Sequence, residues 1–183
     1  MQVIFLVLTF FSLALFQDCD GGKNTQKQRS SETVKAADNG LEVEFTVERA
    51  EVKTGDEFLA KAVFTNRSNK NLRLNTLFLE FAPILLQTRR EDGTEVTRTS
   101  PPFPPEDDGE ENRVTLAPGE SVSFEYRGLD LFGEDLKDGK YSVRFRHENN
   151  VTKYGDWTGK LETDWVGFKV DSKLDAVGVA PMA

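Results

Sequence analysis

The chain has 183 residues, of which 38% are hydrophobic and 30% charged, and its formal net charge is -8. This balance is that of a globular domain rather than a disordered chain, and the negative charge disfavours nucleic acids and anionic membrane surfaces as partners. One Cys and one His are too few for a structural zinc site or an internal disulfide, so we expect neither a metal nor a cofactor.

Residues 1–19 predict a signal sequence. An uncharged apolar run from Val3 to Phe16 is shorter than the roughly 20 residues of a membrane span and has the length of a secretory hydrophobic region. Ser-Leu-Ala at 12–14 offers a cleavage motif. The alternative is a buried N-terminal strand or helix. We therefore expect a protein that is secreted, periplasmic or associated with the cell envelope.

Cys19 follows this run directly and resembles the acylated cysteine of bacterial lipoproteins. The three preceding residues, Phe16, Gln17 and Asp18, depart from the pattern of that family at every position. The alternatives are a free thiol or a residue discarded with the leader. We expect membrane association only if Cys19 carries a lipid.

The next segment, Asp20–Gly40, has almost no apolar residues and no hydrophobic period. Such a composition is typical of a flexible tether. We therefore predict a disordered tether over residues 20–40, followed by a single folded domain over residues 41–171 and a flexible C-terminal tail over residues 172–183.

The body of the chain alternates apolar and polar residues in short segments separated by Gly and Pro turns such as Asp92-Gly93 and Pro118-Gly119. Alternation of this kind is typical of strands with one wet face, and no segment shows a helical period. We predict an all-β antiparallel sandwich of seven to nine strands. The expected strands begin at Leu41, Phe58, Leu72, Ile84, Val114, Val122, Tyr141 and Val166.

The segment that leads into the last expected strand contains a change of parity. Val166, Phe168 and Val170 alternate in one register, whereas Leu161 and Thr163 belong to the other. A regular strand cannot bury both sets on one face. We therefore predict a β-bulge between Thr163 and Val166, with Asp164 exposed and Trp165 partly exposed.

Tyr141 stands at the entrance of a strand, directly after Asp-Gly-Lys. DGKYSVRF resembles the tyrosine corner of immunoglobulin-like sandwiches, in which the tyrosine hydroxyl bonds back to the preceding connection. We expect a buried Tyr141 ring and a hydroxyl bonded within residues 128–139. The alternative is an ordinary tyrosine at a strand entrance.

VTLAPGESVSFEY, DGKYSVRF and WTGKLETDWVGFKV together resemble the second half of bacterial secreted Ig-like domains. The Leu-x-Pro-Gly-Glu turn and the Gly-x-Tyr strand are also similar, more weakly, to the intracellular proteinase inhibitor family of bacilli. These resemblances imply a sandwich fold and say little about activity.

Three aromatic residues are candidates for partner binding because they stand in polar connections. Phe103 lies in the proline-rich acidic stretch SPPFPPEDDGEENR, and Tyr154 and Trp157 lie in the connection before the last strand. Sandwich loops often carry recognition. The alternatives are a stiff surface connection around Phe103, and Trp157 packed as a lid over the end of the core.

Asn66 and Asn150 each begin an N-glycosylation sequon. His147 is the lone histidine and has no nucleophile or metal motif near it in the sequence. We therefore do not expect an enzyme.

The leading hypothesis is an exported, non-enzymatic Ig-like binding module, monomeric, whose partner is a protein or glycan at the cell surface. A protease inhibitor that uses a sandwich loop as a substrate mimic and a structural accessory subunit of an envelope complex are the alternatives.

Overall fold

The computed structural model describes residues 31–53, 58–80, 85–96, 110–127, 136–152 and 154–173. Within these ranges the chain forms eleven strands, one short α-helix and one 3-10 turn. They are β1 (Glu32–Asp38), β2 (Leu41–Val47), β3 (Glu51–Val52), β4 (Leu59–Asn66), β5 (Leu72–Asn75), α1 (Thr76–Glu80), β6 (Leu86–Arg90), η1 (Glu110–Asn112), β7 (Arg113–Leu116), β8 (Ser121–Arg127), β9 (Gly139–Asn149), β10 (Gly159–Glu162) and β11 (Val166–Val170).

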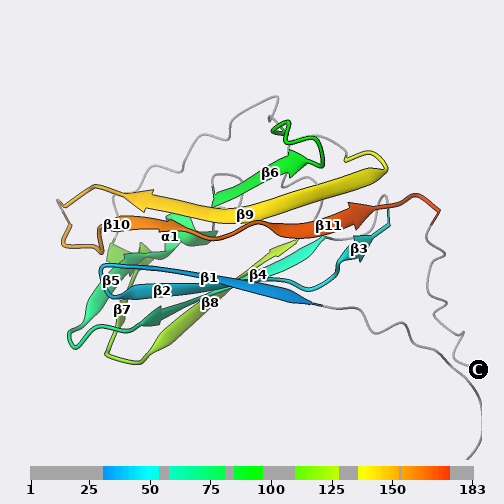
Figure 1. The fold of residues 1–183 in the computed structure, drawn as a ribbon. Coiled ribbons are helices and arrows are strands. Elements are labelled where there is room, and N and C mark those ends of the chain that lie inside the picture. The colour runs from blue at the N-terminus through cyan, green and yellow to red at the C-terminus, as the bar shows by residue number, and fades with distance from the viewer. Residues whose placement is uncertain are drawn as a thin grey trace, which may run out of the picture.

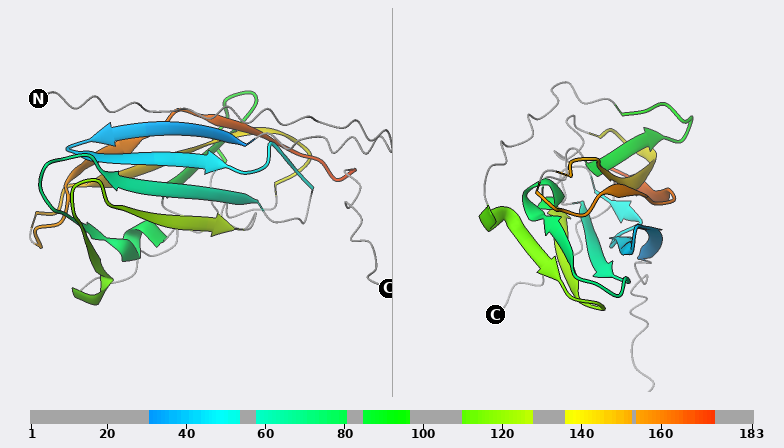
Figure 2. Two further views of the ribbon diagram at one scale, coloured as in Figure 1. Left: turned by 90° about the horizontal axis from the view of Figure 1, so that it is seen from below. Right: turned by 90° about the vertical axis from the view of Figure 1, so that its left-hand side faces the viewer.

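Two main sheets lie in separate layers (Figures 1 and 2). One has the strand order β1-β2-β4-β8, and the other has the order β10-β9-β11-β3 with β6 paired to the other side of β9. β5 and β7 form a third, two-stranded sheet. All pairs are antiparallel except β11 with β3. The predicted all-β sandwich is confirmed, with more strands than the seven to nine expected.

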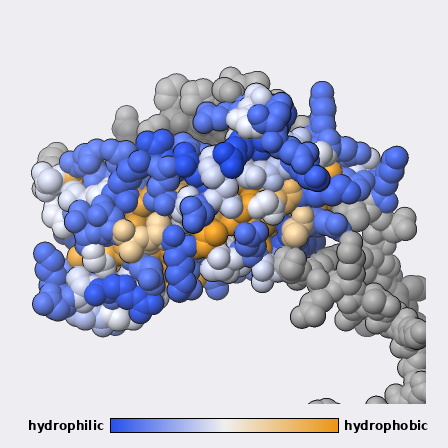
Figure 3. All heavy atoms as spheres, viewed as in Figure 1, coloured by the Kyte–Doolittle hydropathy of each residue, from blue (hydrophilic) through white to orange (hydrophobic). Residues whose placement is uncertain are grey.

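The core lies between the two main sheets and is rich in aromatic rings. The Phe145 ring of β9 lies 6.1 Å from the Phe45 ring of β2 and 5.5 Å from the Phe64 ring of β4, measured between centroids. All three side chains are fully buried. Alternation in β2 and β9 turns every second side chain toward this layer. Apolar surface shows between the two layers as a narrow band with hydrophilic side chains above and below it (Figure 3).

The predicted bulge is present between β10 and β11. Glu162 pairs with Arg146 of β9, whereas Val166 pairs with Val143, so four steps on one strand oppose three on the other. The extra residue lets Leu161 and Val166 both face the core. Asp164 is exposed and Trp165 partly exposed, as predicted.

The boundary of the predicted tether is wrong. Residues 32–38 form β1, which pairs with β2 along its whole length, and Asn39 and Gly40 have φ angles of 46° and 80°. Such angles make the two-residue hairpin turn that Asn-Gly favours. Residues 20–30 of the predicted tether lie outside the described residues.

The N-terminal strand also contacts the other sheet. Asn39 donates a hydrogen bond to the Thr158 carbonyl at 2.9 Å, and the Lys160 amide donates to the Asp38 carboxylate at 2.8 Å. A Cβ at Gly159 would lie 2.5 Å from that carboxylate, so this close approach requires glycine. β1 is therefore part of the domain.

Two other expectations need correction. The strand expected to begin at Leu72 is short, because it ends at Asn75 and α1 follows. Leu77 donates its amide to the Asn75 side chain at 3.1 Å, which satisfies a free amide at the helix start. The turn at Gly119 (φ 83°) is present, but it carries the chain from one sheet to another, because β7 pairs with β5 and β8 with β4.

Only the start of the predicted C-terminal tail lies within the described residues, and Ser172 is held there. Its amide and hydroxyl donate to the two carboxylate oxygens of Asp138 at 2.7 and 2.6 Å. Residues 174–183, the predicted signal sequence and Cys19 lie outside the described residues.

Candidate functional site

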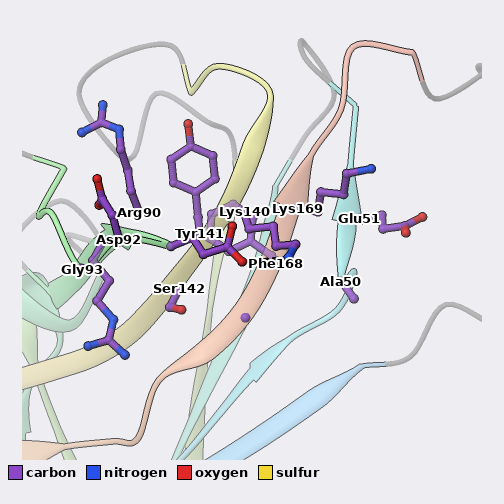
Figure 4. A pocket seen from close by; sticks show the side chains of 13 residues that line it. Ala50, Glu51, Arg90, Asp92, Gly93, Lys140, Tyr141, Ser142, Phe168 and Lys169 are labelled. Atoms are coloured by element: carbon purple, nitrogen blue, oxygen red, sulfur yellow. Dashed lines mark hydrogen bonds and ion pairs between the residues drawn. The ribbon is translucent and has the colours of Figure 1, made fainter.

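A groove of about 650 Å³ lies over the outward side of the sheet that contains β9 and β11 (Figure 4). Its lining comes from the end of β6 and the following turn, from β9 and β11, and from the start of β3. Strand register explains which side chains reach it. Ser142 pairs with Arg89 on one side and with Gly167 on the other, whereas its neighbour Tyr141 turns toward the core.

Ser142 and Gly167 form the floor of the groove. No heavy atom would lie within 4 Å of a Cβ added at Gly167, apart from its chain neighbours. A ligand can therefore approach the backbone there. The Ser142 hydroxyl has no hydrogen-bond partner among the residues that the structure describes, and it is left to bind a ligand or water.

Lys140 and Lys169 pair with each other in the next row along the sheet. Lys140 contacts Glu91 at 2.8 Å and Lys169 contacts Asp171 at 2.6 Å. The hydrogen bond that Lys169 donates to Asp171 raises the pKa of Lys169 and lowers the pKa of Asp171. Each of the two lysines therefore already has a carboxylate partner.

Trp165 lies beside the groove with two arginines against its ring. The guanidinium carbon of Arg89 is 4.1 Å from the ring centroid and that of Arg144 is 4.6 Å from it. Arg144 also donates to Gln87 at 2.8 Å and pairs with Glu162. Arg89 has neither a hydrogen bond nor an ion pair from its guanidinium to any described residue. Arg89 is therefore a cation of this surface that has no carboxylate partner among the described residues.

Tyr141 occupies the position that the tyrosine-corner resemblance implies. Its ring is buried, and its hydroxyl donates to the Lys137 carbonyl at 2.8 Å, within the connection that precedes β9. Both parts of this expectation are confirmed. A second buried tyrosine was not foreseen: the Tyr126 hydroxyl donates to the Leu79 carbonyl of α1 at 2.9 Å.

For Trp157, the structure favours the lid alternative over partner binding. Its side chain is 6% exposed, its indole donates to the Asp38 carbonyl at 3.2 Å, and its ring stacks on His147 with centroids 6.0 Å apart. Trp157 instead covers the end of the core, which is the lid alternative. Burial lowers the pKa of His147 to about 4, so this imidazole is neutral at neutral pH.

Tyr154 is held within the molecule as well. The guanidinium carbon of Arg113 lies 4.5 Å from its ring centroid. Arg113 in turn binds Asp156 at 3.0 Å, both side chains being at most 5% exposed, and Arg73 binds the same carboxylate at 3.2 Å. This buried ion cluster was missed in the sequence, because its members come together only through the fold. Phe103 lies outside the described residues.

The sequon at Asn66 is not accessible in the fold. Asn66 is fully buried, and its side-chain nitrogen donates to the carbonyls of Lys70 and Leu116 at 2.8 and 2.9 Å. Its oxygen accepts from the Ser68 amide at 2.9 Å. This asparagine fastens a turn, as short polar side chains often do. Asn150 is exposed and bonds to Glu148, so its sequon stays a prediction.

No known family profile and no curated protein matches this chain. Among solved structures it is similar to a mutant β-glucosidase from Listeria innocua in complex with laminaribiose, with 15% identity and a TM-score of 0.36, over 72% of this chain and 16% of that one. It is also similar to the β-glucosidase from Listeria innocua in complex with isofagomine, with 14% identity, a TM-score of 0.32, 78% of this chain covered and 16% of that one. The chain thus matches about a sixth of each enzyme, and likenesses this low assign no family.

The described residues contain no cluster of three or more His, Cys, Asp or Glu side chains placed to hold a metal ion. In the same ranges of the chain, none of the helices is both long enough and apolar enough to span a membrane.

Proposed function

We propose that the protein is an exported, non-enzymatic binding module of the cell envelope or extracellular space, and that the outer groove is its recognition surface. Arg89 carries this proposal. It lines the groove, and its guanidinium has only an aromatic ring as a partner among the described residues. The neighbouring cations Lys140, Lys169 and Arg144 each have a carboxylate. A fixed, unpaired guanidinium beside an open floor is a natural contact for a ligand.

The other candidate surfaces support the same choice. At one end of the sandwich, the aromatic side chains expected to bind are occupied, Trp157 by His147 and Tyr154 by Arg113. On the four-stranded sheet, Lys35 is paired with Glu44 and Arg127 with Glu125. Export is proposed from the apolar run at residues 3–16, which lies outside the described residues.

The proposal is tested by blocking the groove without changing the core. Gly167→Arg places a long side chain into open space on the groove floor, and Ser123→Arg places the same side chain on the exposed face of β8 in the other sheet. Both purified variants are incubated with insoluble envelope and extracellular material from the source organism and then sedimented.

We expect wild type and Ser123→Arg to sediment with this material, and Gly167→Arg to bind at least about tenfold more weakly, because the added side chain fills the floor of the groove. Equal binding of all three proteins would place recognition elsewhere. Absence of binding by wild type would contradict the proposed function itself.

A further inference from the structure

We propose that the ligand of the groove is a glycan that carries a carboxylate, a uronic-acid unit, with Arg89 as the anchor of that carboxylate. This inference rests on the proposed function and specifies its ligand class. It depends on three features of the groove: the aromatic contact of Arg89, the composition of the floor and rim, and strand pairing that leaves no free strand edge at the floor.

Arg89 is prepared to bind a planar anion. The guanidinium carbon of Arg89 lies 4.1 Å from the centroid of the Trp165 ring, and the N–H groups of this guanidinium donate to no acceptor among the described residues. These N–H groups match the two oxygens of a carboxylate in a bidentate arrangement. Because the aromatic contact restricts the guanidinium before binding, less side-chain entropy is lost on binding.

The floor and rim suit a polyhydroxylated ring. Ser142 and Gly167 lie beside Arg89 in one row across the sheet, and the open floor at Gly167 admits a ring close to the backbone. The next row lies two residues further along, about 7 Å away. There Lys140 with Glu91 and Lys169 with Asp171 offer both donors and acceptors for sugar hydroxyls.

The same rim disfavours densely anionic ligands. Three carboxylates, Glu51, Glu91 and Asp92, line the groove, and the chain has a net charge of -8. A polyphosphate or a nucleic acid would place several charges against them. A single carboxylate per sugar unit can be held by Arg89 while the sugar hydroxyls bond to the acidic rim.

A protein ligand lacks the anchors that it needs here. β9 is paired along both sides, by β6 on one and by β10 and β11 on the other, so a peptide cannot add a strand at the groove floor. Val151 is the exposed large hydrophobic residue of the described part of the chain, and it belongs to the loop after β9. Hot spots of protein interfaces are usually buried aromatic or apolar anchors.

The test is a calorimetric titration with oligogalacturonides, alginate oligomers and hyaluronan oligomers as uronate probes. Fully methyl-esterified oligogalacturonide serves as a matched neutral probe with the same sugar backbone. The proteins are wild type, Arg89→Gln, Arg89→Lys and, as a control with the same charge change in the other sheet, Lys61→Gln.

We expect wild type and Lys61→Gln to bind at least one uronate probe with affinities within about twofold, because Lys61 lies outside the groove. Arg89→Gln should weaken this binding about 10- to 100-fold, which is the usual effect of losing a hydrogen bond to a charged group. Arg89→Lys should also bind more weakly than wild type, since an ammonium cannot make the bidentate contact. Methyl esterification of the probe should have the same effect as Arg89→Gln.

Equal binding of the esterified and free probes, no effect of Arg89→Gln, or binding of none of the uronate probes would each overturn the inference. If, in any of these cases, Gly167→Arg still abolished sedimentation with envelope material, the proposed function would stand with another ligand. If Gly167→Arg also left sedimentation unchanged, both the uronate inference and the proposed function would be contradicted.

Discussion

Two buried tyrosine hydroxyls bond to backbone carbonyls in different surroundings. Tyr126 is the more deeply buried and donates to Leu79 of α1, whereas Tyr141 donates to Lys137 near the surface. Burial also raises the pKa of Tyr126 well above its ordinary value. The cost of losing a hydrogen bond depends on whether water can replace the missing partner.

We therefore predict that Tyr141→Phe lowers the free energy of unfolding by about 1 kcal/mol and that Tyr126→Phe lowers it by about 2 kcal/mol, because the Leu79 carbonyl would stay buried without a donor. Urea denaturation of both variants checks this order. An unchanged midpoint for Tyr141→Phe would remove the tyrosine corner as a stabilising feature.

The buried imidazole of His147 predicts a pH dependence of stability. Its pKa is about 4 in the folded chain and about 6.5 in an unfolded chain. Between these values the unfolded state binds more protons, so stability rises with pH through this window and is fully present above about pH 6.5. As pH falls from 6.5 to 4, we expect a loss of about 2–3 kcal/mol from this residue.

The measurement is the difference between wild type and His147→Gln in urea denaturation at pH 4 to 7, because carboxylates titrate in both proteins alike. The wild-type advantage should shrink as pH falls. Parallel stability curves for the two proteins would show that His147 does not titrate differently in the folded and unfolded states.

At the scale of elements, the bulge between β10 and β11 makes a sharp prediction. Removal of Asp164 alone leaves Thr163 inward, Trp165 outward and Val166 inward, which is a regular strand. We expect this deletion to leave the domain folded at a cost of about 1–2 kcal/mol. Removal of both Asp164 and Trp165 would turn Val166, Phe168 and Val170 toward solvent.

The stability lost in the double deletion should therefore exceed the free energy of unfolding of a marginally stable domain, roughly 5 kcal/mol. We expect this variant to be unfolded. Circular dichroism during thermal denaturation distinguishes the two deletions. A cooperative transition in the double deletion at the temperature of the single one would show that the parity of β11 is not what fixes its register.

β1 makes a second prediction at this scale. A chain that begins at Ser31 keeps β1, whereas a chain that begins at Leu41 loses it together with its contacts to Trp157 and Lys160. We expect the first to match the stability of the full chain and the second to be less stable by at least about 2 kcal/mol, since several hydrogen bonds are lost. Equal urea midpoints for the two shortened chains would show that β1 does not contribute to the stability of the domain.

The sequence predicted a structural feature correctly where the residues of a single element determine it. The parity change at Thr163–Val166 is a local contradiction, and a bulge resolves it. β1 was missed because its side chains are mostly exposed and polar, although Asn39-Gly40 is a strong hairpin signal. The single turn of α1 is too short to show a helical period.

At the scale of the whole molecule, the groove could not be predicted from the sequence. Arg89, Ser142 and Gly167 are distant in the chain, and only the registers of β6, β9 and β11 place them in one row. Asn66 and Trp157 show the converse, because residues that look suited to modification or recognition in the sequence are buried in the fold. The residues of a candidate site on a sheet face are brought together by strand register and not by a sequence motif.

The proposed function depends on recognition of a ligand at the outer groove. The most direct measurement is a titration of the ¹⁵N-labelled chain with an oligogalacturonide, followed by two-dimensional NMR. We predict that the backbone amides of Arg89, Ser142 and Gly167 and the indole of Trp165 shift together and saturate, while the indole of buried Trp157 does not move. Shifts centred instead on residues 148–158, with the groove amides unchanged, would contradict the account.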